Sequence, residues 1–299
     1  MLDYKLLEAL SAVTRMGSFE KAAVELSVTQ SAVSQRVKLL EQRVGRFLLI
    51  RTSPVQATEE GQKLLRHVQQ VQLLEKELAS ELVDEADTGF STIRLAVNAD
   101  SLATWLPDAL GELFRTGMLL ELEVDDQDVT LEHLRSGQVM GAISSRGTAL
   151  QGCSSEKLGV MRYITVATPT FIDEFCNTGL NSGLNSDSLR KIPTVLYGRD
   201  DELQNRFLKR YFDLDAGQFP AHILPAAQSF IDAARQGMAY ALVPELQAAP
   251  QLNSGELVEM MPGKYLDVAL YWHCWNLQPA MLRIVADNLR VAARNCLRN

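Results

Sequence analysis

At the start of the chain, apolar residues recur at spacings of three and four, which is the pattern of short amphipathic helices. Three helices are predicted before residue 45, and their inward faces are formed by Leu2, Leu6, Leu10 and Val13, by Phe19, Ala22, Ala23 and Leu26, and by Val33, Val37, Leu40 and Val44. Ser18 and Thr29 stand directly before the second and third helices, where a hydroxyl oxygen caps free backbone N–H groups. The start of the chain is therefore predicted to be a compact group of short helices.

The outer face of the third predicted helix carries small hydrogen-bonding side chains, namely Gln30, Ser31, Ser34, Gln35 and Lys38. Two short helices joined by a tight turn, the second of them polar at its outer N-terminal face, are typical of a helix-turn-helix. Gln can bond adenine in the major groove, Ser can reach a base edge or a phosphate, and Lys can hold a phosphate. An ordinary solvated helix face is the alternative interpretation.

The pattern of residues 45–58 predicts a β-hairpin wing. Arg51 in this wing is placed to reach a phosphate beside the DNA groove. Thr58 caps a helix of some 25 residues with one apolar stripe, formed by Leu64, Val68, Val71, Leu74, Leu78 and Leu82. A long helix with one apolar face favours coiled-coil dimerisation, and packing against the rest of its own chain is the alternative.

Beyond a polar hinge at residues 84–92, short β-rich apolar runs alternate with helical patterns. The predicted strands are Ile93–Val97, Leu120–Val124, Val139–Ser144, Tyr163–Ala167, Thr194–Tyr197, His222–Leu224, Tyr240–Val243 and Val268–Trp272. This alternation predicts an α/β body with largely parallel sheets, and ligands in such folds bind at the carboxyl ends of strands.

The charge of the chain is distributed unevenly. The 299 residues carry a formal net charge of −8, which by itself argues against a nucleic-acid ligand. Residues 1–66, however, hold ten basic and seven acidic side chains, so this segment is +3 and the remainder is −11. The asymmetry favours a small DNA-contacting head on an acidic body, and it favours DNA contact over plain solvation for the polar helix face.

Several classes of protein are excluded or disfavoured by what the sequence lacks. No run approaches the roughly 18 apolar residues of a membrane helix, and the first residues have no signal-peptide pattern, so a cytoplasmic protein without a membrane partner is predicted. The four cysteines are isolated from one another, which predicts structural thiols, no metal site and no cofactor. No nucleophile elbow, dinucleotide fingerprint, P-loop or zinc-protease motif is present, so an enzyme is not expected.

The head resembles the N-terminal signature of LysR-type transcriptional regulators. The matching positions are Ala22, Ala23, Leu26, Thr29, Gln30, Ser31, Ala32, Val33, Ser34, Gln35, Leu40, Glu41, Gly45, Leu48, Arg51, Thr58 and Gly61. Leu49 departs from the pattern, because the family commonly has Phe there. Residues 29–36, 58–65, 96–106 and 270–273 are similar to one subfamily, whose members respond to lysine and arginine and are also described as inhibitors of chromosome initiation.

This resemblance implies a winged helix-turn-helix head rich in α-helix and a periplasmic-binding-protein-like effector body of two α/β lobes. The predicted divisions are a DNA-binding domain at 1–58, a dimerisation helix and hinge at 59–91, and an effector-binding domain at 92–299. Within the last, lobe I covers about 92–161 and 268–299, and lobe II about 162–267. Double-stranded DNA, a second copy of the chain in a homodimer that assembles into tetramers, and RNA polymerase are the macromolecular partners to expect.

Two sets of site residues follow. The DNA-contacting set is Ser18, Thr29, Gln30, Ser31, Ser34, Gln35, Arg36, Lys38, Arg51 and Thr58. A cationic amino acid needs donors for its carboxylate and acceptors for its ammonium groups, and the candidates at strand ends and helix starts are Asn98, Asp100, Ser101, Thr104, Asp125, Asp126, Asp200 or Asp201, Gln228 and Ser229. Helix capping or solvation is the alternative role of each.

The function predicted is a DNA-binding transcriptional regulator that senses a small effector, a lysine or an arginine, and controls transport or metabolism genes. An architectural protein that binds a replication origin and inhibits chromosome initiation is the alternative, since such binding depends on DNA shape rather than on an effector.

Overall fold

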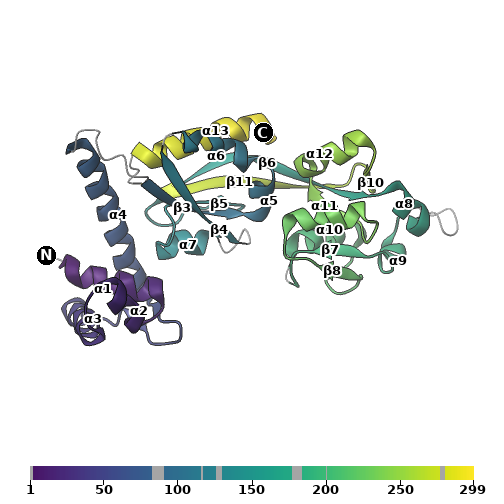
Figure 1. Ribbon diagram of the computed structural model, residues 1–299. Coiled ribbons are helices and arrows are strands. Elements are labelled where there is room, and N and C mark those ends of the chain that lie inside the picture. Colours follow the sequence, from purple (N-terminus) through teal and green to yellow (C-terminus); the bar gives the residue numbers. More distant parts are fainter. Residues whose placement is uncertain are drawn as a thin grey trace.

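The computed structural model describes residues 3–82, 91–115, 117–125, 130–176, 184–199, 201–276 and 280–299. The molecule is elongated: the N-terminal helices lie at one end, a long helix leads away from them, and the remaining elements form two groups that share long strands (Figure 1). None of the described helices combines the length and the hydropathy that a membrane crossing requires.

The N-terminal group consists of helices and a short hairpin, namely α1 (Tyr4–Met16), α2 (Phe19–Glu25), α3 (Gln30–Val44), β1 (Leu49–Ile50), β2 (Gln56–Ala57) and α4 (Glu59–Leu82). The predicted caps are present. Ser18 Oγ accepts from the backbone N–H of Glu20 at 3.2 Å, and Thr29 Oγ1 accepts from that of Ala32 at 3.2 Å. β1 and β2 pair antiparallel where the sequence predicted a wing. The helix-turn-helix and its hairpin therefore follow from local signals.

The inward faces of these helices form a hydrophobic core of their own. Val33, Val37 and Leu40 of α3 are buried, as the spacing predicted, whereas Val44 at the end of α3 is only half-buried. Leu48 joins this core from the start of the hairpin. Burial of this apolar surface is what holds three short helices together, because helices of this length are marginal in isolation.

The apolar stripe of α4 is buried in the head core at one end and exposed further along the helix. Leu65 and Val68 are buried in the head core, whereas Leu74, about two turns further on, is 46% exposed. Along its length α4 also contacts α7 (Thr130–Ser136) of the body. Packing of this helix against its own chain is thus present in part, and dimerisation through the rest of the stripe stays a prediction.

A seven-stranded sheet forms the centre of the body, from β3 (Ser91–Asn98), β4 (Met118–Asp125), β5 (Gly141–Ser144), β6 (Cys153–Ala167), β9 (Ala241–Pro244), β10 (Val258–Glu259) and β11 (Tyr265–Trp275). The order is β10-β6-β11-β5-β3-β4, and β9 also pairs with β6. The helices around the first half are α5 (Ala99–Ala103), α6 (Leu106–Phe114), α7 and α13 (Ala280–Cys296).

The expectation of largely parallel sheets is right for one part of this sheet and wrong for the other. β3 pairs parallel with both β4 and β5, as a strand–helix–strand pattern requires. β11 runs antiparallel to β5 and β6, and β9 and β10 also run antiparallel to β6. The reason is that β6 and β11 are 15 and 11 residues long and cross between the two halves in opposite directions, which the short predicted runs did not reveal.

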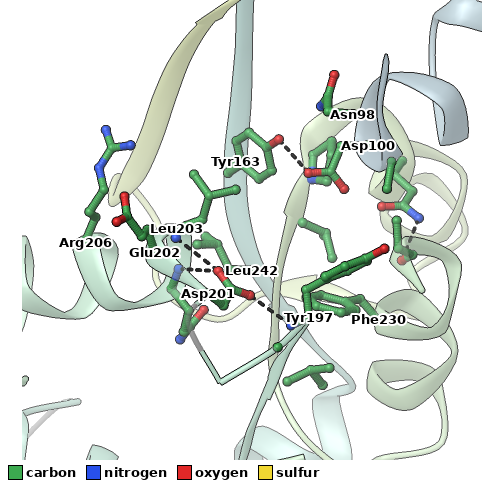
Figure 2. A pocket seen from close by; sticks show the side chains of 18 of the residues that line it. Asn98, Asp100, Tyr163, Tyr197, Asp201, Glu202, Leu203, Arg206, Phe230 and Leu242 are labelled. Carbon is green, nitrogen blue, oxygen red and sulfur yellow. Dashed lines mark hydrogen bonds between the residues drawn. The ribbon is translucent and has the colours of Figure 1, made fainter. Parts of the chain in front are cut away.

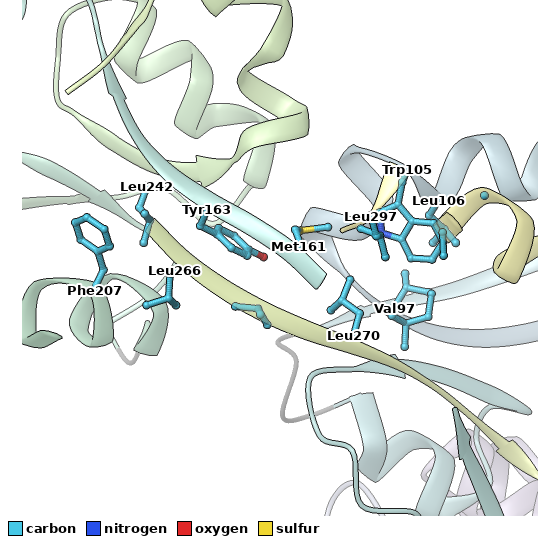
Figure 3. Packing of buried hydrophobic residues seen from close by; sticks show 14 of the residues in the cluster. Val97, Trp105, Leu106, Met161, Tyr163, Phe207, Leu242, Leu266, Leu270 and Leu297 are labelled. Carbon is cyan, nitrogen blue, oxygen red and sulfur yellow. The ribbon is translucent and has the colours of Figure 1, made fainter. Parts of the chain in front are cut away.

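The second half of the body lies at the far end of β6 and β11 (Figure 1). Its other elements are α8 (Pro169–Cys176), α9 (Ser186–Leu189), β7 (Thr194–Leu196), α10 (Glu202–Phe212), β8 (Ala221–Ile223), α11 (Ala227–Arg235) and α12 (Glu245–Ser254). Figure 3 shows buried side chains along the two crossing strands, from Trp105 and Leu106 in the first half to Phe207 in the second. The body is an α/β structure of two halves with a continuous core, so the fold class expected from the sequence is confirmed.

Candidate functional site

The outer face of α3 presents most of the predicted DNA-contacting side chains to solvent. Gln30, Ser31, Gln35 and Lys38 are exposed, and Ser34 and Arg36 are half-buried. Arg51 of the hairpin is exposed, with its guanidinium 5.8 Å from the centroid of the Phe19 ring. Among the described residues, neither Lys38 nor Arg51 forms an ion pair with a carboxylate. This face can therefore offer amide, hydroxyl and cationic groups to a phosphate-bearing ligand.

Three residues of that set have a structural role in the same region. Ser18 and Thr29 cap α2 and α3, and Thr29 Oγ1 also lies 3.0 Å from Ser31 Oγ. Thr58 Oγ1 accepts from the backbone N–H of Gly61 at 3.1 Å and donates to the carbonyl of Phe47 at 2.9 Å. These hydroxyls fix where the helices begin, and thus how the outer face of α3 is presented.

A cavity of about 220 Å³ lies between the two halves of the body (Figure 2). Its wall includes backbone or side-chain atoms of Asn98, Ala99, Asp100, Ser145, Tyr163, Val195, Tyr197, Gly198, Arg199, Asp201, Glu202, Leu203, Gln204, Arg206, Ala227, Phe230, Leu242, Val243, Pro244 and Gln247. The first half contributes the junction of β3 and α5, and the second contributes the starts of α10, α11 and α12. The cavity is thus at the carboxyl end of β3, as the strand-end rule predicted.

Asn98 is the end of β3 and precedes α5, and its side chain is 2% exposed. Neither its amide nitrogen nor its amide oxygen has a hydrogen-bond partner among the described residues, and it does not cap α5. A buried amide with both ends unsatisfied costs free energy unless a ligand or water completes it. Asn98 is therefore a candidate binding group.

Asp100 lies next to it at the start of α5. The hydroxyl of Tyr163, on the crossing strand β6, donates to Asp100 Oδ2 at 2.6 Å, and Figure 2 shows the two side chains pointing toward each other. Tyr163 is 1% exposed, so this phenol fixes the carboxylate at the cavity wall. A carboxylate held in this way can accept hydrogen bonds from an ammonium group.

The neighbouring predicted residues Ser101 and Thr104 have internal partners and do not line the cavity. Ser101 is fully buried, and its hydroxyl oxygen accepts from the indole N–H of Trp105 at 3.1 Å. Thr104 donates its hydroxyl to the carbonyl of Asp100 at 2.6 Å. Both stabilise the turn from α5 into α6, which holds Asp100 in place.

The remaining effector candidates differ in whether they line the cavity. Asp126 and Asp200 lie outside the described residues, and Asp125 is described only as the end of β4. Asp201 lines the cavity, and its carboxylate caps α10 by accepting from Leu203 N–H at 3.0 Å while also accepting from Tyr197 N–H at 2.9 Å. On α11, Ala227 and Phe230 line the cavity, whereas Gln228 and Ser229 do not.

Sequence reasoning missed two glutamines of the second half, Gln204, which is buried, and Gln247, which is half-buried. Gln204 donates its amide to the hydroxyl of Tyr240 at 3.1 Å, and Gln247 donates to the carbonyl of Ala227 at 3.2 Å. Each amide oxygen has no partner among the described residues. Burial raises the pKa of Tyr240, so its phenol stays neutral beside Gln204. Glutamine in an amphipathic helix gives no sequence signal of this role, because it is typical of the solvent face.

Among the described residues, the charged groups of the cavity wall are three carboxylates, Asp100, Asp201 and Glu202, and two guanidinium groups, Arg199 and Arg206. The excess of one negative charge favours a cationic ligand. Within the described ranges no cluster of three or more His, Cys, Asp and Glu side chains is arranged to hold a metal ion. Burial raises the pKa of the Cys153 thiol to about 11, so that thiol is protonated at neutral pH and a poor nucleophile.

Two protein-family models match the chain. "Bacterial regulatory helix-turn-helix protein, lysR family" matches residues 4–62, and "LysR substrate binding domain" matches residues 87–293. The chain is also 42% identical over 297 residues to the HTH-type transcriptional regulator ArgP of Aeromonas salmonicida, a match that covers 99% of this chain and 98% of that protein. The subfamily resemblance seen in the sequence is thus to the ArgP group, and it is confirmed.

Two solved structures are similar over 100% of both chains. The crystal structure of ArgP from Mycobacterium tuberculosis has 37% sequence identity and a TM-score of 0.88. Full-length LysG from Corynebacterium glutamicum with bound effector Arg has 34% identity and a TM-score of 0.82. From the head to the last helix, the chain belongs to the LysR family of bacterial helix-turn-helix regulators.

Proposed function

We propose that the chain is a DNA-binding transcriptional regulator whose cavity binds a basic amino acid, lysine or arginine, as effector. The observation that carries the proposal is the cavity at the end of β3. Its wall holds the Asn98 amide, which has no partner among the described residues, and the Asp100 carboxylate bonded by Tyr163, and the described charged groups of the wall include one more carboxylate than cations. An amino acid with a cationic side chain has a net charge of about +1 at neutral pH, which complements that wall. The arginine bound to LysG supports the same ligand class.

The polar groups of the wall suggest a division of roles. Asp100, oriented by Tyr163, accepts from the α-ammonium, and the Asn98 amide donates to the α-carboxylate. Asp201 and Glu202, from the start of α10 on the opposite half, face the cation of the side chain. The effector then bridges both halves of the body, so its binding favours the arrangement of the halves that it fits best.

In the head, α3 enters the major groove with Gln30 and Ser34 toward base edges, while Lys38 and Arg51 hold phosphates. Ser31, Gln35 and Arg36 extend the same face. The exposure of Gln30, Ser31, Gln35, Lys38 and Arg51 supports this arrangement. The names of the relatives favour gene regulation over replication-origin binding, and they favour a regulator over an enzyme.

We further propose that the chain acts as a homodimer through the exposed part of the α4 stripe, where Leu74 is 46% exposed, and assembles into tetramers. We keep the same boundaries in this proposal. The domains divide at 58/59 and 91/92, and the two lobes divide inside β6 and inside β11. Because its target is chromosomal DNA, its place is the cytoplasm, and RNA polymerase is the partner through which it would act on transcription.

The test is calorimetric titration of the purified full chain with L-arginine and L-lysine, with norleucine as an isostere that lacks the side-chain cation. We expect saturable binding of one or both basic amino acids and none of norleucine. Asp100→Asn should weaken that binding by roughly 10- to 100-fold, since a hydrogen bond to a charged group contributes about 1.5–3 kcal/mol.

Asp187→Asn is the matched control, because this aspartate is exposed on α9 and does not line the cavity. It should bind as the unaltered chain does. Absence of heat with both amino acids, or equal affinity of the Asp100 variant and the unaltered chain, would refute the proposed effector site.

A further inference from the structure

The turn that follows β5 brings one more residue to the cavity. β5 ends at the buried Ser144, and the next residue, Ser145, lines the cavity wall. Ser144 Oγ accepts from the backbone N–H of Arg146 at 3.0 Å. Gly147 lies against the ring of Tyr271, where a Cβ would come within 2.9 Å of the ring carbon Cζ. The turn is therefore held by the Ser144 hydroxyl and confined by the Tyr271 ring.

His273, which lies more than a hundred positions further along the chain, also holds this turn. His273 of β11 is fully buried, and its Nε2 lies 2.7 Å from the carbonyl oxygen of Arg146. A carbonyl oxygen can only accept, so Nε2 carries the ring hydrogen and donates it to the turn. Burial lowers the pKa of His273, so the ring is neutral at physiological pH and Nδ1 has a free lone pair.

The surroundings of His273 argue against a role as an apolar filler. Nδ1 has no partner among the described residues, and neither has the hydroxyl of Ser155, which stands opposite His273 in the register of β6 and β11. An imidazole buried with one unsatisfied nitrogen is less favourable than a hydrocarbon side chain of similar size. The hydrogen bond that it does make is the one to Arg146.

We infer that His273 is a positioning residue of the effector site: by holding the Arg146 carbonyl it fixes the turn that presents Ser145 to the cavity. This inference rests on the proposed function, because it concerns the same cavity. The ring acts through the backbone of the turn and does not touch the effector. Its loss should therefore weaken effector binding and leave the DNA-contacting head unchanged.

The test compares His273→Leu, which removes the donor, with His273→Gln, whose amide nitrogen can take the place of Nε2. Arginine affinity by calorimetry, thermal stability and DNA affinity without effector are measured for each. We expect His273→Leu to bind arginine about tenfold more weakly and His273→Gln to stay within about threefold, as loss or retention of one buried hydrogen bond predicts. DNA affinity without effector should be the same in both.

His222→Leu is the matched control, because this histidine is exposed on β8 and does not line the cavity. Gly147→Ala is a second variant that disturbs the turn from the Tyr271 side, and it decides the matter if His273→Leu does not fold. It should weaken arginine binding as well.

Unchanged arginine affinity in a folded His273→Leu, or in Gly147→Ala when the leucine variant does not fold, would overturn the inference. So would equal losses for the leucine and glutamine variants, since that pattern belongs to packing rather than to the donor. Failure of the unaltered chain to bind arginine or lysine would instead contradict the proposed function, so the two failures are distinguishable.

Discussion

The two ends of the molecule present their polar groups in opposite ways. On the head, Gln30, Gln35 and Lys38 stand exposed on one helix face, and they come from neighbouring positions in the sequence. In the body, Asn98, Gln204 and Gln247 line the cavity wall and come from three distant segments, and each has a buried polar atom without a hydrogen-bond partner among the described residues. The head presents polar and cationic groups on an open surface, whereas the body gathers polar groups in the wall of a cavity.

This difference implies different physics for the two kinds of binding. Contacts to phosphates release counterions, so binding by the head should weaken steeply as salt rises. A ligand in the cavity should be selected by completing buried hydrogen bonds, so ligand preference there should depend much less on salt. The acidic body, with a net charge of −11 outside residues 1–66, should also be repelled from the duplex and leave the contact to the head.

Disturbing the head core and the body core one at a time should change binding the most. Leu40 is fully buried in the head core, and Leu40→Ala should destabilise the head by about 2–5 kcal/mol, the usual cost of such a cavity. DNA binding, measured by fluorescence anisotropy, should be lost or strongly weakened, while arginine still binds in calorimetry.

The matched change in the body is Leu289→Ala, since Leu289 of α13 is also fully buried but belongs to the core of the body. It should impair arginine binding more than DNA binding. If either variant lost both activities to the same extent, the head and body would not be separable as described.

A smaller effect should distinguish base contacts from phosphate contacts within the head. Gln30→Ala should reduce discrimination between specific and non-specific DNA by about 1–3 kcal/mol. Arg51→Ala should weaken binding to all sequences and reduce the slope of log affinity against log salt by about 1. Anisotropy titrations at several salt concentrations measure both, and a uniform loss on every sequence for Gln30→Ala would contradict its base-reading role.

The smallest effect concerns an ion pair of the body. Arg162 donates two hydrogen bonds of 2.8 Å to Asp267, and this guanidinium holds the pKa of the Asp267 carboxyl below its usual value. Since the folded pKa is depressed, the pair stabilises the fold above the ordinary carboxyl pKa of about 4, and this contribution is lost as pH falls through the folded value.

Asp267→Asn should therefore lower stability at neutral pH by at most about 1 kcal/mol, because the pair is partly exposed. It should have less effect at pH 3, and thermal unfolding between pH 7 and pH 3 measures the difference. A variant whose stability deficit stayed constant across that range would argue against the ion pair as its source.

The head could be predicted from the sequence in detail because its determinants are local. The capping hydroxyls of Ser18 and Thr29 and the spacing of Val33, Val37 and Leu40 lie within a few residues of the structure that they specify. The polar face of α3 follows from the same spacing, so the candidate DNA-contacting residues could be named without the fold.

The cavity could be predicted only in part. Asn98 and Asp100 were identifiable because they follow a strand and begin a helix, but Tyr163, Gln204 and Gln247 reach the site through the crossing of β6 and the packing of α10 and α12. The length of β6 and β11 was also hidden, since exposed positions such as Glu156, Lys157 and Asp267 interrupt their hydrophobic pattern. Contacts between distant segments carry no local signal, which is why the sequence alone names Ser101 and Thr104 as effector candidates without showing that their hydroxyls have partners inside the turn.

On this model of regulation, a basic amino acid in the cavity of the body changes how the heads contact DNA. DNase footprinting on a promoter bound by the full chain, with and without saturating arginine and lysine, tests it most directly when the Asp100→Asn variant is run beside the unaltered chain. We expect the footprint of the unaltered chain to change with at least one of the two amino acids, and the variant to need at least about tenfold more ligand for the same change. Footprints that stay identical with and without both amino acids would contradict it.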